Sequence, residues 1–248
     1  MAECASDKEV ARPRSLDAYV VDAGARMKTT SETMERSVEI RVDSITLPGD
    51  LSIPSGAGSL VLFAHGSGSS RRSPRNRFVA SVLQKNSIAT LLFDLLTPRE
   101  DTNYEMRFDI EFLTQRLEAV TAWIESQPDI SSFSIGYFGA STGAAAALGA
   151  AADLPNRIKA VVSRGGRPDI TARDLGRVKA ATLLIVGGLD TMVIHLNREA
   201  FLAIKGAEKQ LHVVSGATHL FEEPGTLEEV AQVASKWFKL HLGSPAVS

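Results

Sequence analysis

The order of hydrophobic residues along the chain is the feature that most constrains its fold. Short, continuous apolar runs alternate with longer segments in which apolar residues recur every three or four positions. The runs occupy residues 60–64, 88–93, 135–138, 158–162, 182–186 and 211–214, and the periodic segments occupy residues 78–84, 108–124, 142–152, 198–204 and 227–242. Continuous runs are typical of strands buried on both faces. Their alternation with helical segments predicts βαβ units, and hence an α/β fold with a mostly parallel sheet and helices on both faces.

The N-terminal region follows a different pattern. Residues 1–35 show no sustained period and predict a loosely ordered extension with a short helical turn at residues 16–21, followed by one domain over residues 36–248. Val38, Ile40 and Val42 alternate with polar residues, which indicates a half-buried strand. Residues 45–53 are predicted to form its hairpin partner, with a turn at Pro48-Gly49. An antiparallel pair should therefore precede the parallel strands.

The composition limits the classes of partner that this chain can have. Hydrophobic residues make up 44% and charged residues 23%, as in ordinary globular domains, and the formal net charge is -2. This balance predicts no nucleic-acid partner and no attraction to an anionic membrane. No apolar stretch approaches the length of a spanning helix, and the first ten residues lack the apolar core of a secretory signal. The single cysteine, Cys4, cannot form an internal disulfide, so a cytoplasmic location is the default expectation.

One motif indicates a serine that can act as a nucleophile. Gly139-Ala140-Ser141-Thr142-Gly143 lies between a predicted strand and an alanine-rich predicted helix. A G-x-S-x-G sequence in that position is a nucleophile elbow, in which a sharp turn presents the serine hydroxyl above the sheet. The alternative is a glycine-rich turn with a structural purpose only. The flanking strand and helix favour the catalytic interpretation, with Ser141 as the nucleophile.

A serine nucleophile needs a base and an acid that orients the base. Asp190 follows the apolar run 182–186, and His219 follows the run 211–214, so both should lie at the same edge of the sheet as Ser141. The chain order of serine, acid and histidine is the order found with this elbow. Asp190 could instead cap the next helix, and Asp94, which also follows a strand, is the alternative acid.

The other histidines have weaker claims to the role of base. His219 itself could be an exposed loop residue, while His195 and His241 lie in helical segments and are expected at the surface. His212 lies within a strand pattern and is given no role. His65 is expected to shape the loop after the first buried strand by hydrogen bonding.

That loop should also stabilise the oxyanion formed during acyl transfer. Its sequence, His65-Gly66-Ser67-Gly68, is rich in glycine, so backbone N–H groups can point into the site. We expect one donor to be the N–H of Thr142, the residue after the nucleophile. The second is expected to be the N–H of Ser67, with Gly66 and Gly68 as competitors.

The motifs HGSGSS, GASTG, GGLD and GATH together resemble the α/β-hydrolase superfamily, in particular its dienelactone-hydrolase-like branch. The resemblance covers about residues 38–242. It implies an eight-stranded sheet, no metal or other cofactor, and hydrolysis through an acyl-enzyme. Dienelactone hydrolases themselves carry a cysteine at the elbow, whereas this chain carries Ser141, which favours carboxylic esters over dienelactone as substrates.

Two further features bear on the substrate. The connections after residues 152 and 162 are too short for a lid domain, so an open site for small soluble esters is expected. Several arginines follow predicted strands at the edge of the sheet where Ser141, Asp190 and His219 are expected. They are Arg71, Arg72, Arg75, Arg77, Arg164 and Arg167. Arginine pairs with carboxylate or phosphate groups, so Arg75 and Arg164 could bind an anionic part of the substrate. Alternatively, the arginines are solvated or pair with Asp169, Asp174 and Glu100.

The sequence therefore predicts a serine esterase that acts on small carboxylic esters through Ser141, His219 and Asp190. Acyl transfer to another acceptor, and amide or lactone hydrolysis, would use the same residues. A third possibility is a non-catalytic binding protein on the same scaffold. The apparently complete triad favours an enzyme.

Overall fold

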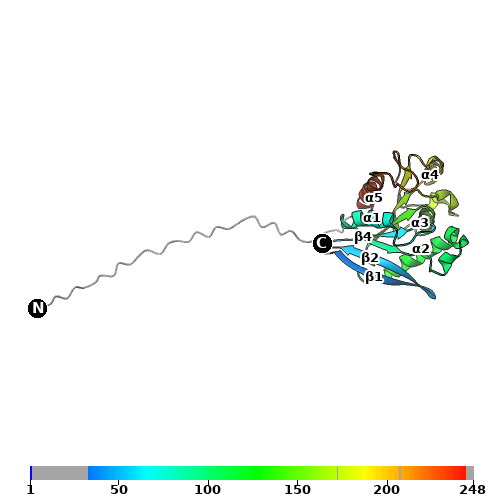
Figure 1. Ribbon diagram of the computed structural model, residues 1–248. Coiled ribbons are helices and arrows are strands. Elements are labelled where there is room, and N and C mark those ends of the chain that lie inside the picture. Colours follow the sequence, from blue (N-terminus) through cyan, green and yellow to red (C-terminus); the bar gives the residue numbers. More distant parts are fainter. Residues whose placement is uncertain (2–32, 172, 207, 244–248) are drawn as a thin grey trace. The chain divides into compact units, whose positions relative to one another are not determined.

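The computed structural model describes residue 1 and residues 33–171, 173–206 and 208–243. Its centre is an eight-stranded sheet with helices on both faces (Figure 1). The strands are β1 (Thr33–Val42), β2 (Ile45–Pro54), β3 (Ser59–Ala64), β4 (Ala89–Phe93), β5 (Ser134–Ala140), β6 (Ile158–Arg164), β7 (Ala181–Gly187) and β8 (Lys209–Val214). The pairs β1/β2 and β2/β4 are antiparallel and all the others are parallel, so the predicted architecture is confirmed.

The order of the strands fixes where a site can form. From one edge of the sheet to the other, the order is β1-β2-β4-β3-β5-β6-β7-β8. After β3 the chain passes to β4 on one side, and it later returns to β5 on the other side of β3. The crevice beyond the carboxyl ends of β3 and β5 is therefore a topological switch point, the place where open α/β sheets bind ligands.

The helices divide the hydrophobic core into two layers. On one face, α1 (Pro74–Gln84) and α5 (Thr226–Leu242) pack over a cluster that includes Phe63, Phe138 and Phe238. On the other face lie α2 (Ile110–Glu125), α3 (Thr142–Asp153) and α4 (Thr191–Ala203). Residues 142–152 of α3 are all buried, because their small side chains allow this helix to approach the sheet closely.

The N-terminal part differs from the prediction in two respects. The sheet begins at Thr33, so the last residues of the expected extension belong to β1, while residues 2–32, including the turn expected at 16–21, lie outside the described residues. Pro48-Gly49 forms no turn, because both residues lie inside β2. The Pro48 carbonyl accepts a hydrogen bond from the Asp94 N–H (3.2 Å), and a Cβ on Gly49 would lie 3.0 Å from Val38 Cγ2. Close strand packing, and not a reversal of the chain, therefore explains this glycine.

The connections that surround the carboxyl edge are short. Between β6 and β7, in the connection that was expected to be too short for a lid domain, there are two single turns of 3₁₀ helix, Pro168–Ile170 and Leu175–Arg177. Two more, η1 (Glu100–Thr102) and η2 (Glu105–Phe108), join β4 to α2 and were not anticipated. No lid domain is inserted within the described part of the chain, and none of its helices has the length and apolarity needed to cross a membrane.

Candidate active site

Ser141 occupies a strained turn between β5 and α3. Its backbone angles are φ 52° and ψ -118°, a conformation that a residue with a side chain rarely adopts. The neighbouring glycines allow it. A Cβ on Gly143 would lie 2.2 Å from the Ala64 carbonyl oxygen, and a Cβ on Gly139 would lie 2.4 Å from Ala144 Cα. The close approach of β3, β5 and α3 thus enforces the elbow and places Ser141 at the N-terminus of α3.

The packing at Gly143 leads to a stability prediction. We expect Gly143→Ala to lower the free energy of unfolding by about 3 kcal/mol, because the added methyl group overlaps backbone atoms that cannot move without separating β3 from α3. Gly206→Ala is the matched control, since a Cβ there meets nothing within 4 Å. Urea denaturation of both variants measures the difference. Equal stabilities would contradict this account of the elbow.

Asp190 and His219 are in direct contact. Asp190 follows β7, His219 lies in the loop after β8, and His219 Nδ1 is 2.6 Å from Asp190 Oδ2. Asp190 does occupy the N-cap position of α4, but its side chain makes no capping hydrogen bond. The Asp190 carboxylate is therefore not used to cap the helix and is available to orient the His219 imidazole.

Gly165 lies between His219 and the turn that holds Ser141. A Cβ on Gly165 would lie 3.3 Å from His219 Cε1, so the imidazole rests against this glycine. The preceding residue, Arg164, accepts a hydrogen bond from the Ser141 N–H at its carbonyl oxygen (3.2 Å). His219 and the Ser141 elbow thus both border the short turn that follows β6. Gly165 was missed in the sequence, although the pair Gly165-Gly166 directly after a strand was the available signal.

The alternative acid has another partner. Asp94 Oδ1 accepts the backbone N–H of Arg71 (2.7 Å), and its carboxylate forms an ion pair with the same arginine. Asp94 therefore holds the segment that follows residues 65–68, which we call the oxyanion loop. Of the two aspartates, Asp190 is the one in contact with His219.

The remaining histidines lie outside this group. His195 is exposed beside Glu199, as expected, and His212 contacts Glu229. His241 was expected at the surface, but its side chain is only 11% exposed because its ring packs against Trp237 with centroids 4.2 Å apart. None of these three rings contacts Ser141 or Asp190 through a hydrogen bond among the described residues.

His65 shapes the oxyanion loop, as predicted. Its Nε2 accepts the N–H of Leu95 (3.0 Å), so the ring proton must lie on Nδ1, which donates to the Gly66 carbonyl (3.0 Å). Burial lowers the pKa of His65 and keeps the ring neutral. A neutral ring that uses both nitrogens in this way cannot act as the general base.

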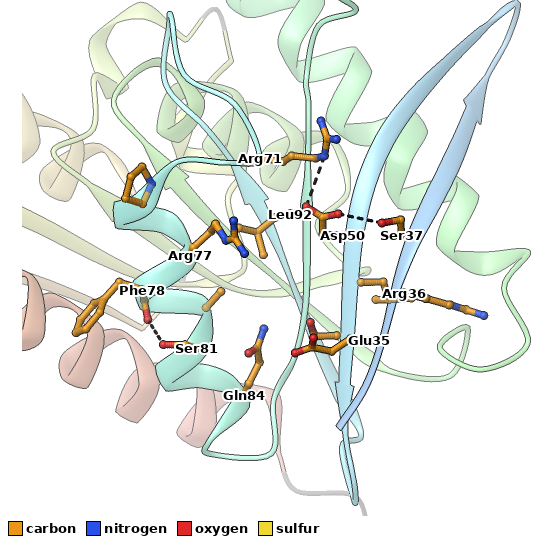
Figure 2. Close-up of a pocket in the computed structure, with 14 residues that line it drawn as sticks. Glu35, Arg36, Ser37, Asp50, Arg71, Arg77, Phe78, Ser81, Gln84 and Leu92 are labelled. Atoms are coloured by element: carbon orange, nitrogen blue, oxygen red, sulfur yellow. Dashed lines mark hydrogen bonds and ion pairs between the residues drawn. The ribbon is translucent and has the colours of Figure 1, made fainter. Parts of the chain in front are cut away.

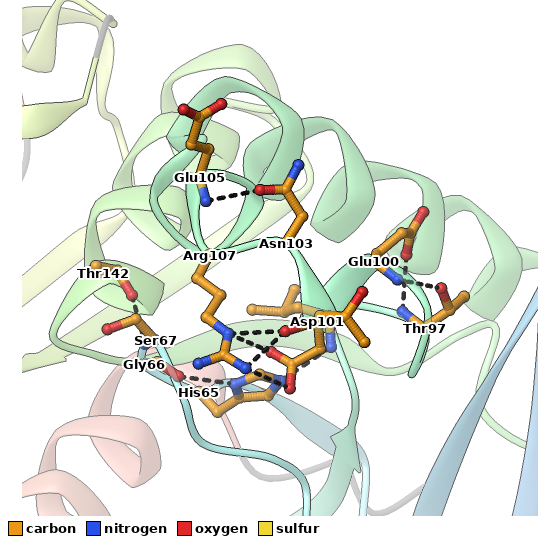
Figure 3. A network of polar contacts seen from close by, with 12 residues as sticks. His65, Gly66, Ser67, Thr97, Glu100, Asp101, Asn103, Glu105, Arg107 and Thr142 are labelled. Carbon is orange, nitrogen blue, oxygen red and sulfur yellow. Dashed lines mark hydrogen bonds and ion pairs between the residues drawn. The ribbon is translucent and has the colours of Figure 1, made fainter.

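The backbone donors of this loop are arranged differently from the expectation. The Ser67 N–H donates to Thr142 Oγ1 (2.8 Å), so it is already occupied and can serve an oxyanion only by giving up this bond (Figure 3). Gly66 packs against Ser141, since a Cβ on Gly66 would be 3.2 Å from Ser141 Cβ. Within the described residues, the Thr142 N–H meets no acceptor, which leaves it available to the oxyanion.

The two arginines singled out in the sequence have contrasting surroundings. Arg75 Nη1 pairs with Glu222 at 2.7 Å. Arg164 is buried beneath the Phe221 ring, with Cζ 5.7 Å from the ring centroid, and its Nε and Nη1 have no hydrogen-bond partner among the described residues. Burial, together with the nearby charge of Arg75, lowers the pKa of Arg164 to about 10. Arg167 pairs with Asp169, as in the alternative interpretation.

A larger cleft lies elsewhere on the domain. It has a volume of about 640 Å³ and opens between the β1–β2 hairpin and α1, where Asp50, Arg71 and Phe78 line it (Figure 2). None of the predicted catalytic residues lines this cleft. The described residues also include no group of three or more histidine, cysteine, aspartate or glutamate side chains suited to a metal ion.

Comparison with known proteins identifies the family. Residues 81–241 match the dienelactone hydrolase family. The chain belongs to the dienelactone hydrolase family. Membership supports hydrolase activity and confirms the resemblance seen in the motifs. A crystal structure of dienelactone hydrolase from Anabaena variabilis is 52% identical, covers 85% of this chain and 99% of its own, and superimposes with a TM-score of 0.83.

More distant and longer relatives add context. Est1E from Butyrivibrio proteoclasticus is 18% identical with a TM-score of 0.69, covering 82% of this chain and 97% of its own, which shows a shared fold. A Mycobacterium tuberculosis protein named putative phosphoribosyl transferase is 53% identical over 232 residues. That match covers 94% of this chain but 51% of the relative, so the chain spans about half the length of these curated relatives. Their name describes the longer proteins.

Proposed function

We propose that this member of the dienelactone hydrolase family is a serine esterase for small carboxylic esters. The observation that carries the proposal is the contact of Asp190 with His219, beside the strained elbow that presents Ser141. An acid, a base and a serine from three separate strand ends are the groups that acyl transfer requires.

The mechanism follows from the position of each group. Ser141 Oγ attacks the ester carbonyl and its proton passes to His219 Nε2, while Asp190 keeps the other ring proton on Nδ1. The negative charge that develops on the carbonyl oxygen is stabilised by the Thr142 N–H and by a second N–H from the oxyanion loop, where Gly66 and Ser67 are the candidates. His219 then protonates the departing alcohol, and water repeats the steps on the acyl-enzyme to release the acid.

Stopped-flow hydrolysis of p-nitrophenyl acetate tests this proposal. We expect an initial burst that approaches one p-nitrophenol per protein chain, followed by slower saturable turnover, because acylation and deacylation are separate steps. Rates that match buffer alone would contradict it. An added alcohol, and thioester or lactone substrates, would separate hydrolysis from acyl transfer and from related reactions. The thioester is included because a protein of Aspergillus aculeatus named thiohydrolase is 31% identical over 144 residues, 55% of this chain and 43% of its own.

We further propose that Arg164 helps to bind an anionic part of the substrate. A buried charge without a carboxylate partner is costly, and a substrate carboxylate or phosphate would offset that cost. With a pKa of about 10, the guanidinium is still charged at neutral pH. Arg75, already paired with Glu222, would contribute by raising the local positive potential.

The prediction concerns the preference between two esters. In Arg164→Met, the ratio of kcat/KM for 4-acetoxybenzoate, whose carboxylate is on the alcohol side, over phenyl acetate should fall about tenfold, since a charge-assisted hydrogen bond is lost. The exposed Arg72, changed to alanine, is the control and should keep the wild-type ratio. An unchanged ratio combined with a lower kcat for both esters would instead mean that Arg164 positions the His219 loop through Phe221.

A further inference from the structure

The segment between β4 and α2, which we call the strap (residues 97–108), lies over the oxyanion loop. Arg107 in the strap donates from Nε and Nη2 to the Asp101 carbonyl oxygen at 3.0 and 2.6 Å, and Nη2 also lies 3.2 Å from the Asp101 carboxylate (Figure 3). Glu100 ties the strap to α2 through an ion pair with the buried Arg116 (2.9 Å). These bonds hold the Arg107 side chain in one place.

A narrow crevice separates the strap from the oxyanion loop. Three buried leucines, Leu95, Leu96 and Leu113, supply its apolar lining. Gly68 and the polar residues Ser67, Thr142, Asp101 and Arg107 also line it. Its volume is about 10 Å³, which is room for one water-sized group. The crevice is therefore apolar enough for a hydrocarbon group but too small for a long chain.

The crevice adjoins the position of the acyl group. Thr142 directly follows Ser141, and Gly66, which also lines the crevice, packs against the Ser141 side chain. With the carbonyl oxygen at the Thr142 N–H and the alcohol on the side of His219, the direction left for the acyl chain on Ser141 Oγ is along the oxyanion loop. His219 lies on the opposite side, against Gly165, so the alcohol that it protonates leaves in that direction.

The alcohol side is open and has an apolar rim. Leu189 and Leu220, the immediate neighbours of Asp190 and His219, are 63% and 42% exposed, and Met192 at the start of α4 is 74% exposed. These side chains can contact an alcohol group without enclosing it. The two sides of the site thus differ in size, and this difference predicts selectivity for the acyl group.

We propose that the crevice is the acyl-binding pocket, that it accepts an acyl group of about two carbons, and that Arg107 sets its depth. The substrate class is then acetyl and similar short-chain esters with varied alcohols. This inference rests on the proposed esterase function. Arg107 is a specificity-determining residue here because its guanidinium closes the crevice: a Cβ on Gly68 would lie 3.9 Å from Nη1.

The test compares p-nitrophenyl acetate, butyrate and hexanoate. In the wild type, kcat/KM should fall by about tenfold or more from acetate to hexanoate, because the longer chains do not fit. Arg107→Ala opens the crevice and should raise the hexanoate-to-acetate ratio about tenfold. Arg107→Met retains most of the side-chain volume and should keep the wild-type ratio. Arg99→Ala removes an exposed arginine from the same strap and should also leave the ratio unchanged.

Two further measurements keep the proposal falsifiable. Leu96→Ala deepens the crevice from its apolar side and should also raise the hexanoate-to-acetate ratio. If Arg107→Ala does not fold, Leu96→Ala tests whether the crevice binds the acyl group. The proposal would be overturned if whichever of Arg107→Ala and Leu96→Ala fold keep the wild-type hexanoate-to-acetate ratio. Esters that differ only in the alcohol, from ethyl to hexyl acetate, should show no such dependence on length. Failure of the esterase function itself would give a different result, with no turnover of acetate by the wild type.

Discussion

Ser141→Ala should abolish ester hydrolysis and leave the fold intact, with kcat reduced by about five to six orders of magnitude, as for other hydrolases of this mechanism. The hydroxyl oxygen forms the bond to the acyl group, so no neighbouring residue can replace it. The loss should appear in p-nitrophenyl acetate hydrolysis under conditions in which circular dichroism shows a folded protein.

Ser141→Gly supplies the matched variant. Both substitutions remove the hydroxyl, but only glycine relieves the strain of φ 52°, ψ -118°. We therefore expect Ser141→Gly to be equally inactive yet more stable than Ser141→Ala by about 1 kcal/mol in urea denaturation. An alanine variant that is the more stable of the two, or that keeps a substantial part of the activity, would argue against a strained catalytic elbow.

Asp190→Asn should have the second largest effect, a fall in kcat of about 10,000-fold, the size seen when the same change is made in other triads. An asparagine amide can donate to Nδ1 and so favours the tautomer with its proton on Nε2, which cannot accept the serine proton. His219 would still be held near Gly165, so KM should change much less than kcat.

Asp94→Asn tests which of the two aspartates considered from the sequence, Asp94 or Asp190, orients the base. Because Asp94 is paired with Arg71, its loss should reduce kcat by no more than about tenfold and lower the stability by about 1–2 kcal/mol. Steady-state kinetics and urea denaturation of both variants give the comparison. If Asp94→Asn were the more damaging to kcat, the assignment of the acid would be wrong.

The elements that could be predicted are those with a local cause. Five parallel strands, β3 to β7, are buried with apolar residues on both faces, so they were visible as continuous runs in the sequence. The sixth run, 211–214, also marked a strand, but β8 lies at the edge of the sheet and only its last residue, Val214, is buried. The elbow was visible because Gly139 and Gly143 are needed wherever β3, β5 and α3 approach closely. Asp190 and His219 were singled out because each lies in the loop after a strand of that sheet, three residues beyond β7 and five residues beyond β8.

The features that escaped prediction depend on contacts between distant residues. Pro48-Gly49 has the composition of a turn, but pairing with β1 and β4 keeps it extended. The use of the Ser67 N–H by the Thr142 hydroxyl joins residues 75 positions apart. Likewise, the crevice exists only because the strap packs over the oxyanion loop. No periodicity or motif in the sequence of the strap indicates that contact.

The most direct test of the central claim is to treat the folded protein with a fluorophosphonate and map the modified residue by mass spectrometry of its peptides. A serine activated by a histidine displaces fluoride and becomes phosphonylated. We expect stoichiometric labelling of Ser141, and none in the Ser141→Ala or His219→Ala variants. Folded wild-type protein that takes no label, or that takes it on a different residue, would contradict the account.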